Sequence, residues 1–306
     1  MINNTANKTL IVVIGPTAVG KTAMAIEIAK HFKTEIISAD SRQFYKELKI
    51  GVASPSEEEL KSAKHHFIGN LSINDSYNVS KFETESLICL KTIFIRNNQA
   101  VLVGGSGLYI DAVCKGIDDL PDPEENLREE IKENFKNHGI EYLRNQLKIL
   151  DYEYYNQVDL ANPKRLMRAI EVCLTTGKTF TSLRINQQKP RDFNIIKIGL
   201  ELPRDVLYER INKRVDLMIE EGLEKEVKSL ISQKNLNALN TVGYKEIFDY
   251  LEGKTSFEFA IEKIKINSRR YAKRQLTWFK RDKEIKWFNP IETDKIINFI
   301  KSNNKE

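Results

Sequence analysis

The segment Gly15-Pro16-Thr17-Ala18-Val19-Gly20-Lys21-Thr22 is a complete G-x-x-x-x-G-K-[ST] phosphate-binding loop. It follows an apolar run, Leu10–Ile14, that predicts a strand, and it precedes a helical pattern of apolar residues. In this context backbone N–H groups turn inward onto phosphate oxygens, and the helix N-terminus adds a partial positive charge. A plain glycine-rich turn does not explain a Lys-Thr pair at that offset. The segment therefore predicts that Lys21 binds the outer phosphate and that the Thr22 hydroxyl binds a magnesium ion.

The rest of the chain indicates an α/β fold of the P-loop NTPase type, a parallel sheet flanked by helices. Five short runs rich in Ile and Val predict strands, and long helical patterns separate them; these runs are residues 9–14, 35–38, 100–103, 195–202 and 285–288. Between the third and fourth runs the pattern is charged and helical. We therefore expect an α/β catalytic domain over residues 1–120 and 190–306, carrying an all-helical insertion over 121–189.

Composition limits the class of protein. The 306 residues are 41% hydrophobic and 30% charged, an ordinary globular balance. No apolar stretch approaches the roughly 20 residues of a membrane helix, and the N-terminus lacks the apolar core of a signal peptide. We therefore expect a cytoplasmic protein with no membrane association. The three cysteines form no C-x-x-C pair, and His65 and His66 are adjacent, so neither pattern predicts a metal site.

Two further polar segments follow predicted strands. Asp40 comes after the second strand, and the glycine turn Gly104–Gly107 comes after the third. Ligands of open parallel sheets bind beyond the carboxyl ends of the strands, so these segments and the phosphate loop should converge on one pocket. Asp40 is a candidate general base, with a helix cap or a contact to the magnesium shell as the alternative. Ser106 has the same choice between a ligand contact and a helix cap.

A pair of arginines predicts a cationic lid. Arg210 and Arg214 are four residues apart on a predicted helix and so share one face. A separate apolar stripe consists of Leu207, Ile211, Val215 and Met218. A solvated charged face is the commoner reading of such a pair. The sharper hypothesis is that two guanidiniums close over a phosphate leaving group, which their planar forks bind bidentately.

Taken together and in this order, the motifs resemble the tRNA dimethylallyltransferases, also called tRNA isopentenyltransferases, in their shorter bacterial form. The resemblance covers most of the chain and rests on Gly15–Thr22, Ser38–Gln43, Tyr45, Ile50–Ser54, Leu102–Tyr109, Asn162–Val172, Gly177-Lys178, Arg210–Leu223, Val242–Tyr244 and Ala272–Trp278. It implies transfer of a dimethylallyl group from dimethylallyl diphosphate to N6 of the adenosine 3′-adjacent to the anticodon. The tRNAs concerned read codons that begin with U, and diphosphate is released. Although this loop type is typical of nucleotide- and ATP-binding proteins, the resemblance implies a diphosphate with no nucleotide attached.

The resemblance also implies residue roles. Asp40 would accept the N6 proton of an adenosine flipped out of its stack. Lys21, Arg214 and Thr22, the last through Mg²⁺, would stabilise charge on the leaving diphosphate. Arg210 would join the cradle. Contacts with the anticodon stem-loop would come, by the same resemblance, from Asp40, Ser41, Arg42, Gln43, Ser106, Arg128, Lys164, Arg165, Leu166, Met167, Arg168, Arg270 and Arg274. The enzyme would act as a monomer.

A basic C-terminal helix is expected from Ile264 to about Lys283. Arg270, Arg274 and Arg281 fall on one stripe, and Tyr271 and Trp278 on a neighbouring stripe that we assign to packing. Either the basic stripe is a solvated face, or it follows the phosphates of the anticodon stem.

Three other functions compete with this one. An adenylate isopentenyltransferase that makes free cytokinin would share the cradle and the aspartate. A nucleoside-kinase-like phosphotransferase and a non-catalytic RNA-binding module are the others. The cationic helix around Lys164, Arg165 and Arg168, together with the basic C-terminal helix, favours a macromolecular substrate.

Overall fold

The computed structural model describes residues 8–185 and 188–304, and the chain divides into two compact units. The first unit comprises Met1–Cys114 with Arg191–Glu306, and the second comprises Lys115–Pro190. The second unit therefore begins a few residues before position 121, where the sequence placed the start of the insertion.

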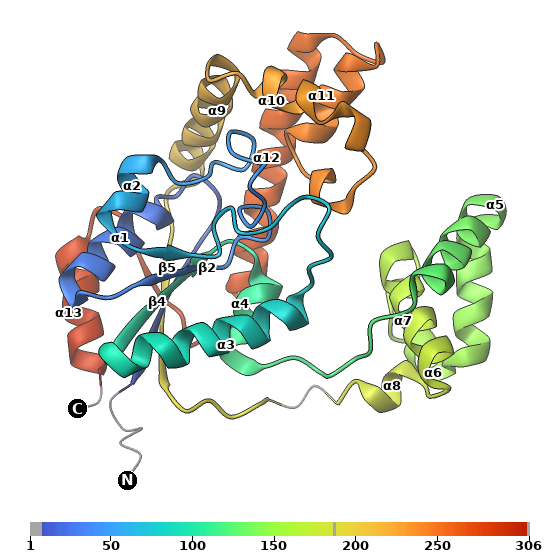
Figure 1. The fold of residues 1–306 in the computed structure, drawn as a ribbon, viewed down its shortest axis with the longest axis horizontal. Helices are drawn as coiled ribbons and strands as arrows, with labels where there is room; N and C mark the ends of the chain where they lie inside the picture. The colour runs from blue at the N-terminus through green and yellow to red at the C-terminus, as the bar shows by residue number, and fades with distance from the viewer. Residues whose placement is uncertain (1–7, 186–187, 305–306) are drawn as a thin grey trace. The chain divides into compact units, whose positions relative to one another are not determined.

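The first unit is built on a six-stranded, all-parallel sheet of order β3-β2-β4-β1-β5-β6 (Figure 1). Its strands are β1 (Thr9–Ile14), β2 (Ile36–Ser38), β3 (His65–His66), β4 (Gln99–Gly104), β5 (Asn194–Leu200) and β6 (Lys286–Phe288). The predicted α/β fold and its five strands are confirmed. The sequence did not predict β3, because two residues are too few to show alternation.

Both faces of the sheet are covered by helices, which is why its strands are apolar runs. Along β1 successive side chains point to opposite faces. Ile11 and Val13 pack with α1 (Lys21–Phe32) and α13 (Thr293–Asn303), whereas Leu10 and Val12 pack with α3 (Val79–Arg96) and α4 (Gly107–Lys115). All six residues of β1 are buried, as a central parallel strand requires. The helices of the first unit are α1 (Lys21–Phe32), α2 (Glu57–Ser62), α3 (Val79–Arg96), α4 (Gly107–Lys115), α9 (Arg204–Glu220), α10 (Leu223–Ser229), α11 (Tyr244–Leu251), α12 (Phe257–Phe279) and α13 (Thr293–Asn303), with short 3₁₀ turns η2 (Ile231–Gln233) and η3 (Asn237–Leu239).

A third core lies among helices rather than on the sheet. Tyr45 and Leu48, which follow β2, pack with Val215 of α9, with α10 and α11, and with Ile264 of α12. The sequence did not predict this helical cap, because its members are distant along the chain and only the fold brings them together. The cap supplies one wall of the pocket described below.

The second unit is all-helical: α5 (Glu125–Leu150), α6 (Tyr152–Tyr155), α7 (Pro163–Thr176) and α8 (Phe180–Leu183). As predicted, α7 begins after Asn162, whose side chain accepts a hydrogen bond from the N–H of Arg165, with Pro163 at the first helical position. Gly139, at a φ of 71°, breaks α5 in two. Leu143 and Leu147 of α5 pack against α7 to form a separate core.

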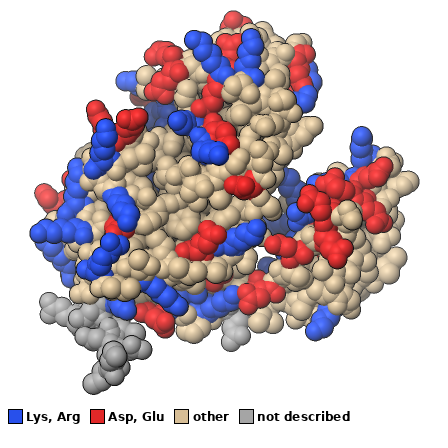
Figure 2. All heavy atoms as spheres, viewed as in Figure 1, with Lys and Arg blue, Asp and Glu red and all other residues tan. Residues whose placement is uncertain are grey.

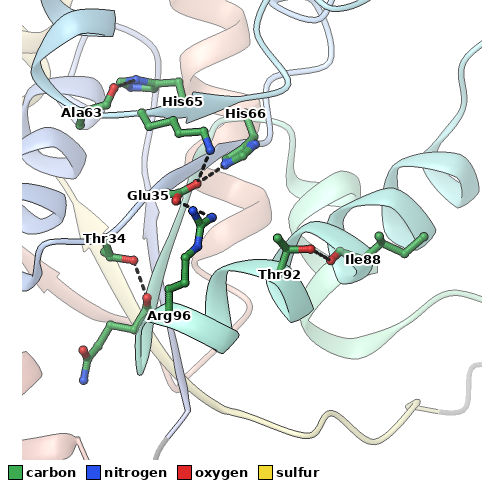
Figure 3. A network of polar contacts seen from close by, with 10 residues as sticks. Thr34, Glu35, Ala63, His65, His66, Ile88, Thr92 and Arg96 are labelled. Carbon is green, nitrogen blue, oxygen red and sulfur yellow. Dashed lines mark hydrogen bonds and ion pairs between the residues drawn. The ribbon is translucent and has the colours of Figure 1, made fainter.

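An ion-pair cluster fastens the β3 edge of the sheet (Figure 3). The Glu35 carboxylate contacts His66 Nε2 at 2.7 Å, Arg96 Nη2 at 2.9 Å and Lys64 Nζ at 3.1 Å. Burial favours the neutral acid, but hydrogen bonds from His66 and Lys64 outweigh it and lower the pKa of Glu35. His65 hydrogen-bonds the Ala63 carbonyl through Nδ1 at 2.8 Å. Both histidines thus have structural partners, and no cluster of three metal-ligating side chains occurs in residues 8–185 and 188–304.

Candidate active site

The phosphate loop joins β1 to α1 in a conformation that its glycines make possible. Gly15 and Gly20 have φ values of 151° and 108°, a region that favours glycine. A Cβ on Gly15 would also lie only 2.6 Å from the carbonyl oxygen of Leu200 on β5. The Lys21 ammonium donates to the Pro16 carbonyl at 2.8 Å and so folds back over the loop.

The surroundings of Lys21 disfavour its charged form. Burial lowers its pKa to about 8, the neighbouring Asp40 partly opposes this, and Arg214 lowers it further. A buried ammonium beside a guanidinium is stabilised by any anion that enters between them. The site is therefore suited to a ligand with more than one negative charge.

The two arginines of α9 lie at the loop but differ in exposure. Arg214 is half-buried, and its Nη1 is 3.4 Å from the Thr17 hydroxyl. Burial lowers the pKa of Arg214, and the charge of Arg210 adds to this. Arg210 is exposed, with its guanidinium near Gly20. The predicted apolar stripe is confirmed, since α9 buries Leu207, Ile211 and Val215.

Asp40 follows β2 directly and faces the same space. Its Oδ1 accepts from the N–H of Arg42 at 3.0 Å, a local turn rather than a helix cap. The neighbouring Ser41 N–H donates to the Ser106 hydroxyl at 3.1 Å. This bond joins the segment after β2 to the glycine turn after β4. Three segments far apart in sequence thus meet at the carboxyl edge of the sheet, as predicted.

A pocket of about 130 Å³ opens between these groups and the helical cap. One part of its lining is polar and the other apolar, the arrangement expected of a site for a small amphipathic ligand. The polar part consists of Thr17, Asp40, Arg42, Arg214, Thr241, Ser268 and Tyr271. The apolar part includes Val52, Ile211, Val215, Met218, Val242 and Ile264.

The segment Lys49–Ala53 forms part of the pocket wall, and hydrogen bonds hold it at both ends. The Glu226 carboxylate accepts from the N–H groups of Lys49, Ile50 and Gly51 at 2.9–3.1 Å, and from the Tyr244 hydroxyl at 2.6 Å. The Gln43 side chain donates to the Ala53 carbonyl at 2.9 Å. A Cβ on Gly51 would lie 2.5 Å from the Tyr244 ring, so the wall has no room for a larger residue.

Comparison with known proteins identifies the family. The model of the IPP transferase family matches residues 43–282. A tRNA dimethylallyltransferase of Christiangramia forsetii is 54% identical over 96% of this chain and 97% of that protein. The chain belongs to the IPP transferase family. A Bacteroides fragilis tRNA dimethylallyltransferase is 51% identical, over 97% of this chain and 99% of its own. The crystal structure of the full-length tRNA isopentenylpyrophosphate transferase of Bacillus halodurans has a TM-score of 0.71 and 36% identity, covering 96% of each chain.

The residues expected to contact tRNA in this IPP transferase fall into different settings. Lys164 and Arg165 are exposed at the start of α7. Arg168 and Arg128 both pair with Glu171, at 3.7 Å and 3.2 Å. Leu166, also expected to contact tRNA, presents no exposed side chain. Its side chain is fully buried in the core of the second unit, and Met167 is partly buried against the same core.

On α12 the sequence predicted the arginines better than the aromatics. Arg270 and Arg274 are exposed, but α12 ends at Phe279, so Arg281 lies beyond the helix and the three-arginine stripe is wrong at that end. Trp278 packs as predicted, and its Nε1 donates to Asp111 at 2.9 Å. Tyr271 does not belong to the packing stripe, because it lines the pocket. Burial, with the nearby Asp40 charge, raises the pKa of Tyr271.

The sequence missed three features of the site: the apolar wall, the Glu226 clasp and the buried Gln275. Gln275 had a local signal, as a polar residue between buried Ala272 and Phe279 on one helix. Much of the wall falls within segments that carry the family resemblance, Ile50–Ser54, Arg210–Leu223 and Val242–Tyr244, but only the helical cap brings these segments together with Glu226.

Proposed function

We propose that this enzyme transfers a dimethylallyl group from dimethylallyl diphosphate to N6 of the adenosine next to the anticodon, in tRNAs that read codons beginning with U. The observation that carries the proposal is the single pocket shared by a cationic phosphate loop, an apolar wall and the carboxylate of Asp40. A prenyl diphosphate needs the first two, and a proton-losing acceptor needs the third. A phosphotransferase acting on nucleosides has no evident use for an apolar wall beside the phosphate loop.

In this mechanism the adenosine nitrogen bonds to C1 of the dimethylallyl group as the C1–O bond to diphosphate breaks. Lys21, Arg210 and Arg214 stabilise the charge that grows on the leaving diphosphate. Asp40 takes the proton that N6 loses, which requires the base to lie within hydrogen-bond reach of that nitrogen. The apolar wall holds the alkyl group and excludes water that would otherwise compete as acceptor.

Magnesium fits the donor set as a partner of the diphosphate. Thr22 stands next to Lys21 in the first turn of α1 and offers a hydroxyl ligand. Mg²⁺ retains several waters and binds through few protein groups plus substrate phosphates, so the Thr22 hydroxyl suffices where the described residues supply no three-ligand cage. The ion would supply further charge neutralisation at the diphosphate.

The tRNA is proposed to contact the exposed cations of α7 and α12. Figure 2 shows basic and acidic side chains interspersed over the face in view, without one field of a single sign. The phosphate contacts would be made by exposed cations of these two helices, Lys164, Arg165, Arg270 and Arg274. In the described chain no helix is long and apolar enough to cross a bilayer. We propose that the enzyme acts in the cytoplasm as a monomer, with the pocket residues of the first unit supplying the whole reaction site.

The deciding experiment is incubation with dimethylallyl diphosphate, magnesium and unmodified tRNA, followed by mass analysis of the nucleosides. We expect N6-dimethylallyl adenosine in tRNA, and chelation of magnesium should suppress it. Parallel reactions with AMP and with ATP plus nucleosides test the alternatives. Product from AMP at a rate matching tRNA would favour the adenylate enzyme, and phosphoryl transfer would favour a kinase.

Replacing Arg270 and Arg274 together with glutamine should weaken tRNA binding and flatten its salt dependence. Each lost phosphate contact lowers the slope of log K against log[salt] by about one unit. Turnover at saturating tRNA should persist, because neither residue lines the pocket. Filter binding at several salt concentrations measures the slope, with Lys254→Gln, on an exposed turn, as the control. An unchanged slope in the double variant would show that this face of α12 is an ordinary solvated surface that does not contact tRNA phosphates.

Glu226→Ala should loosen the pocket wall. The change removes the acceptor of three backbone N–H groups, and each unsatisfied group costs about 1–3 kcal/mol when it stays buried. We expect the KM for dimethylallyl diphosphate to rise about tenfold, or about 1.4 kcal/mol in binding, with tRNA affinity unchanged. Steady-state kinetics measure it, and Glu224→Ala on the same helix is the control. Equal KM values in the two variants would show that the clasp does not shape the site.

A further inference from the structure

One buried amide connects the phosphate loop to the rest of the site. Gln275 of α12 is only 5% exposed. Its Oε1 accepts from the N–H of Thr17 at 2.8 Å, and its Nε2 donates to the Gly105 carbonyl at 3.0 Å. Both ends of the amide are therefore satisfied by backbone from two different loops, the one after β1 and the one after β4.

The contact on the loop side falls on a residue that meets the lid. Thr17 hydrogen-bonds Gln275 through its N–H, and its hydroxyl lies 3.4 Å from Nη1 of Arg214. The hydrogen bond that holds the Thr17 backbone therefore also holds the part of the loop that faces the Arg214 guanidinium. Because the Thr17 N–H donates to a side chain outside the loop, it does not turn inward toward the phosphate-binding space.

The contact on the other side is closely packed. A Cβ on Gly105 would lie 2.1 Å from Nε2 of Gln275 and 3.7 Å from Nζ of Lys21. The Gly105 backbone is therefore packed tightly against the Gln275 amide, and the Lys21 ammonium lies close to the same glycine. A shift of the Gln275 amide would displace the glycine turn that faces the Lys21 ammonium.

The same helix also reaches the half of the site that holds the base. Tyr271 is one helical turn before Gln275, so the two share a face. Tyr271 lines the pocket beside Ser106, whose hydroxyl accepts from the N–H of Ser41, next to Asp40. One face of α12 thus contacts the segments that carry the phosphate loop, the second glycine turn and the base.

We propose that Gln275 is a positioning residue that sets the phosphate loop against the second glycine turn and ties both to α12. The proposal rests on the proposed function for its kinetic consequence, but its binding consequence needs only an anion in the loop. A misplaced loop should bind diphosphate more weakly and should also place the leaving group badly in the transition state, so kcat and affinity should both fall.

The test compares variants that differ in the two hydrogen bonds. Gln275→Met keeps the side-chain length but removes both bonds. We expect inorganic diphosphate to bind about tenfold more weakly and kcat for dimethylallyl transfer to fall about tenfold, with tRNA affinity unchanged. Gln275→Glu keeps the acceptor for Thr17 and should lie between the wild type and Gln275→Met. Calorimetry with inorganic diphosphate gives the affinity, and single-turnover transfer gives the rate.

A double-variant cycle tests the contact from its other side. Gly105→Ala places a methyl group against the amide and should reproduce the loss seen in Gln275→Met. Gln275→Ala makes room for that methyl, so Gly105→Ala should add little in that background. Fully additive losses would overturn the proposal. The cycle also stands in for Gln275→Met if that variant does not fold.

Phe279→Leu is the control for a merely structural role. Phe279 is buried on the same helix, one turn beyond Gln275. It should lower the melting temperature while leaving diphosphate affinity and kcat unchanged. If Gln275→Met behaves like Phe279→Leu, Gln275 serves only folding and the proposal fails. Failure of the proposed function would look different: the wild type would bind inorganic diphosphate, and Gln275→Met would weaken it, yet tRNA would gain no dimethylallyl group.

Discussion

Asp40→Asn is expected to slow dimethylallyl transfer by about 100-fold or more, the usual effect of losing a positioned proton acceptor. The amide is nearly the same size as the carboxylate but cannot take the proton that N6 loses. Its oxygen can still accept from the N–H of Arg42, as Oδ1 of Asp40 does at 3.0 Å. The local turn should therefore survive, and a loss of rate can be assigned to the missing base.

Single-turnover transfer at saturating tRNA and dimethylallyl diphosphate measures this effect. Binding of inorganic diphosphate should change little, because Lys21, Arg210 and Arg214 remain. Asp205→Asn, on the exposed first turn of α9, removes one carboxylate far from the reacting atoms and should leave the rate at the wild-type value. Near-normal turnover in Asp40→Asn would end the assignment of Asp40 as base.

The parts of this fold that sequence predicts are those in which local order and final structure agree. The run Thr9–Ile14, the loop after it and the amphipathic α9 each carry their own periodicity or turn chemistry, so their structure follows from short windows. The converging edge of the sheet followed from topology, since parallel strands present their carboxyl ends together. The sequence alone therefore predicted that Asp40 and the glycine turn lie near the phosphate loop.

The parts that sequence missed depend on tertiary packing. Leu166 lies within a segment expected to contact tRNA, yet its side chain packs against α5 in the core of the second unit. Tyr271 follows an arginine on a basic helix, but its ring lines the pocket because α9 and α12 pack against each other there. The two-residue β3 has no pattern, and its place is set by pairing with β2. In each case the decisive partner is far away in sequence.

Lys21→Ala is expected to weaken dimethylallyl diphosphate binding by about 10- to 100-fold, the loss of one charge-assisted hydrogen bond, and to slow transfer further. The second effect arises because charge on the leaving diphosphate is greater in the transition state than in the substrate. Affinity for tRNA should be almost unchanged, since the Lys21 ammonium folds back over the phosphate loop and donates to the Pro16 carbonyl. Lys30→Ala, on the exposed face of the same helix, is the matched control.

The pH dependence gives a second, sharper signature of Lys21. With its pKa lowered to about 8 in the free protein, the ammonium is charged at pH 7 and loses its proton above about pH 8. A bound diphosphate stabilises the charged form, so binding above pH 8 must take up a proton. The affinity of the wild-type protein for diphosphate should then fall with rising pH, by at most about tenfold per pH unit. The affinity of Lys21→Ala should not show this pH dependence. If tRNA binding collapsed in Lys21→Ala while diphosphate bound normally at every pH, the assignment of the loop to diphosphate would be overturned in favour of tRNA.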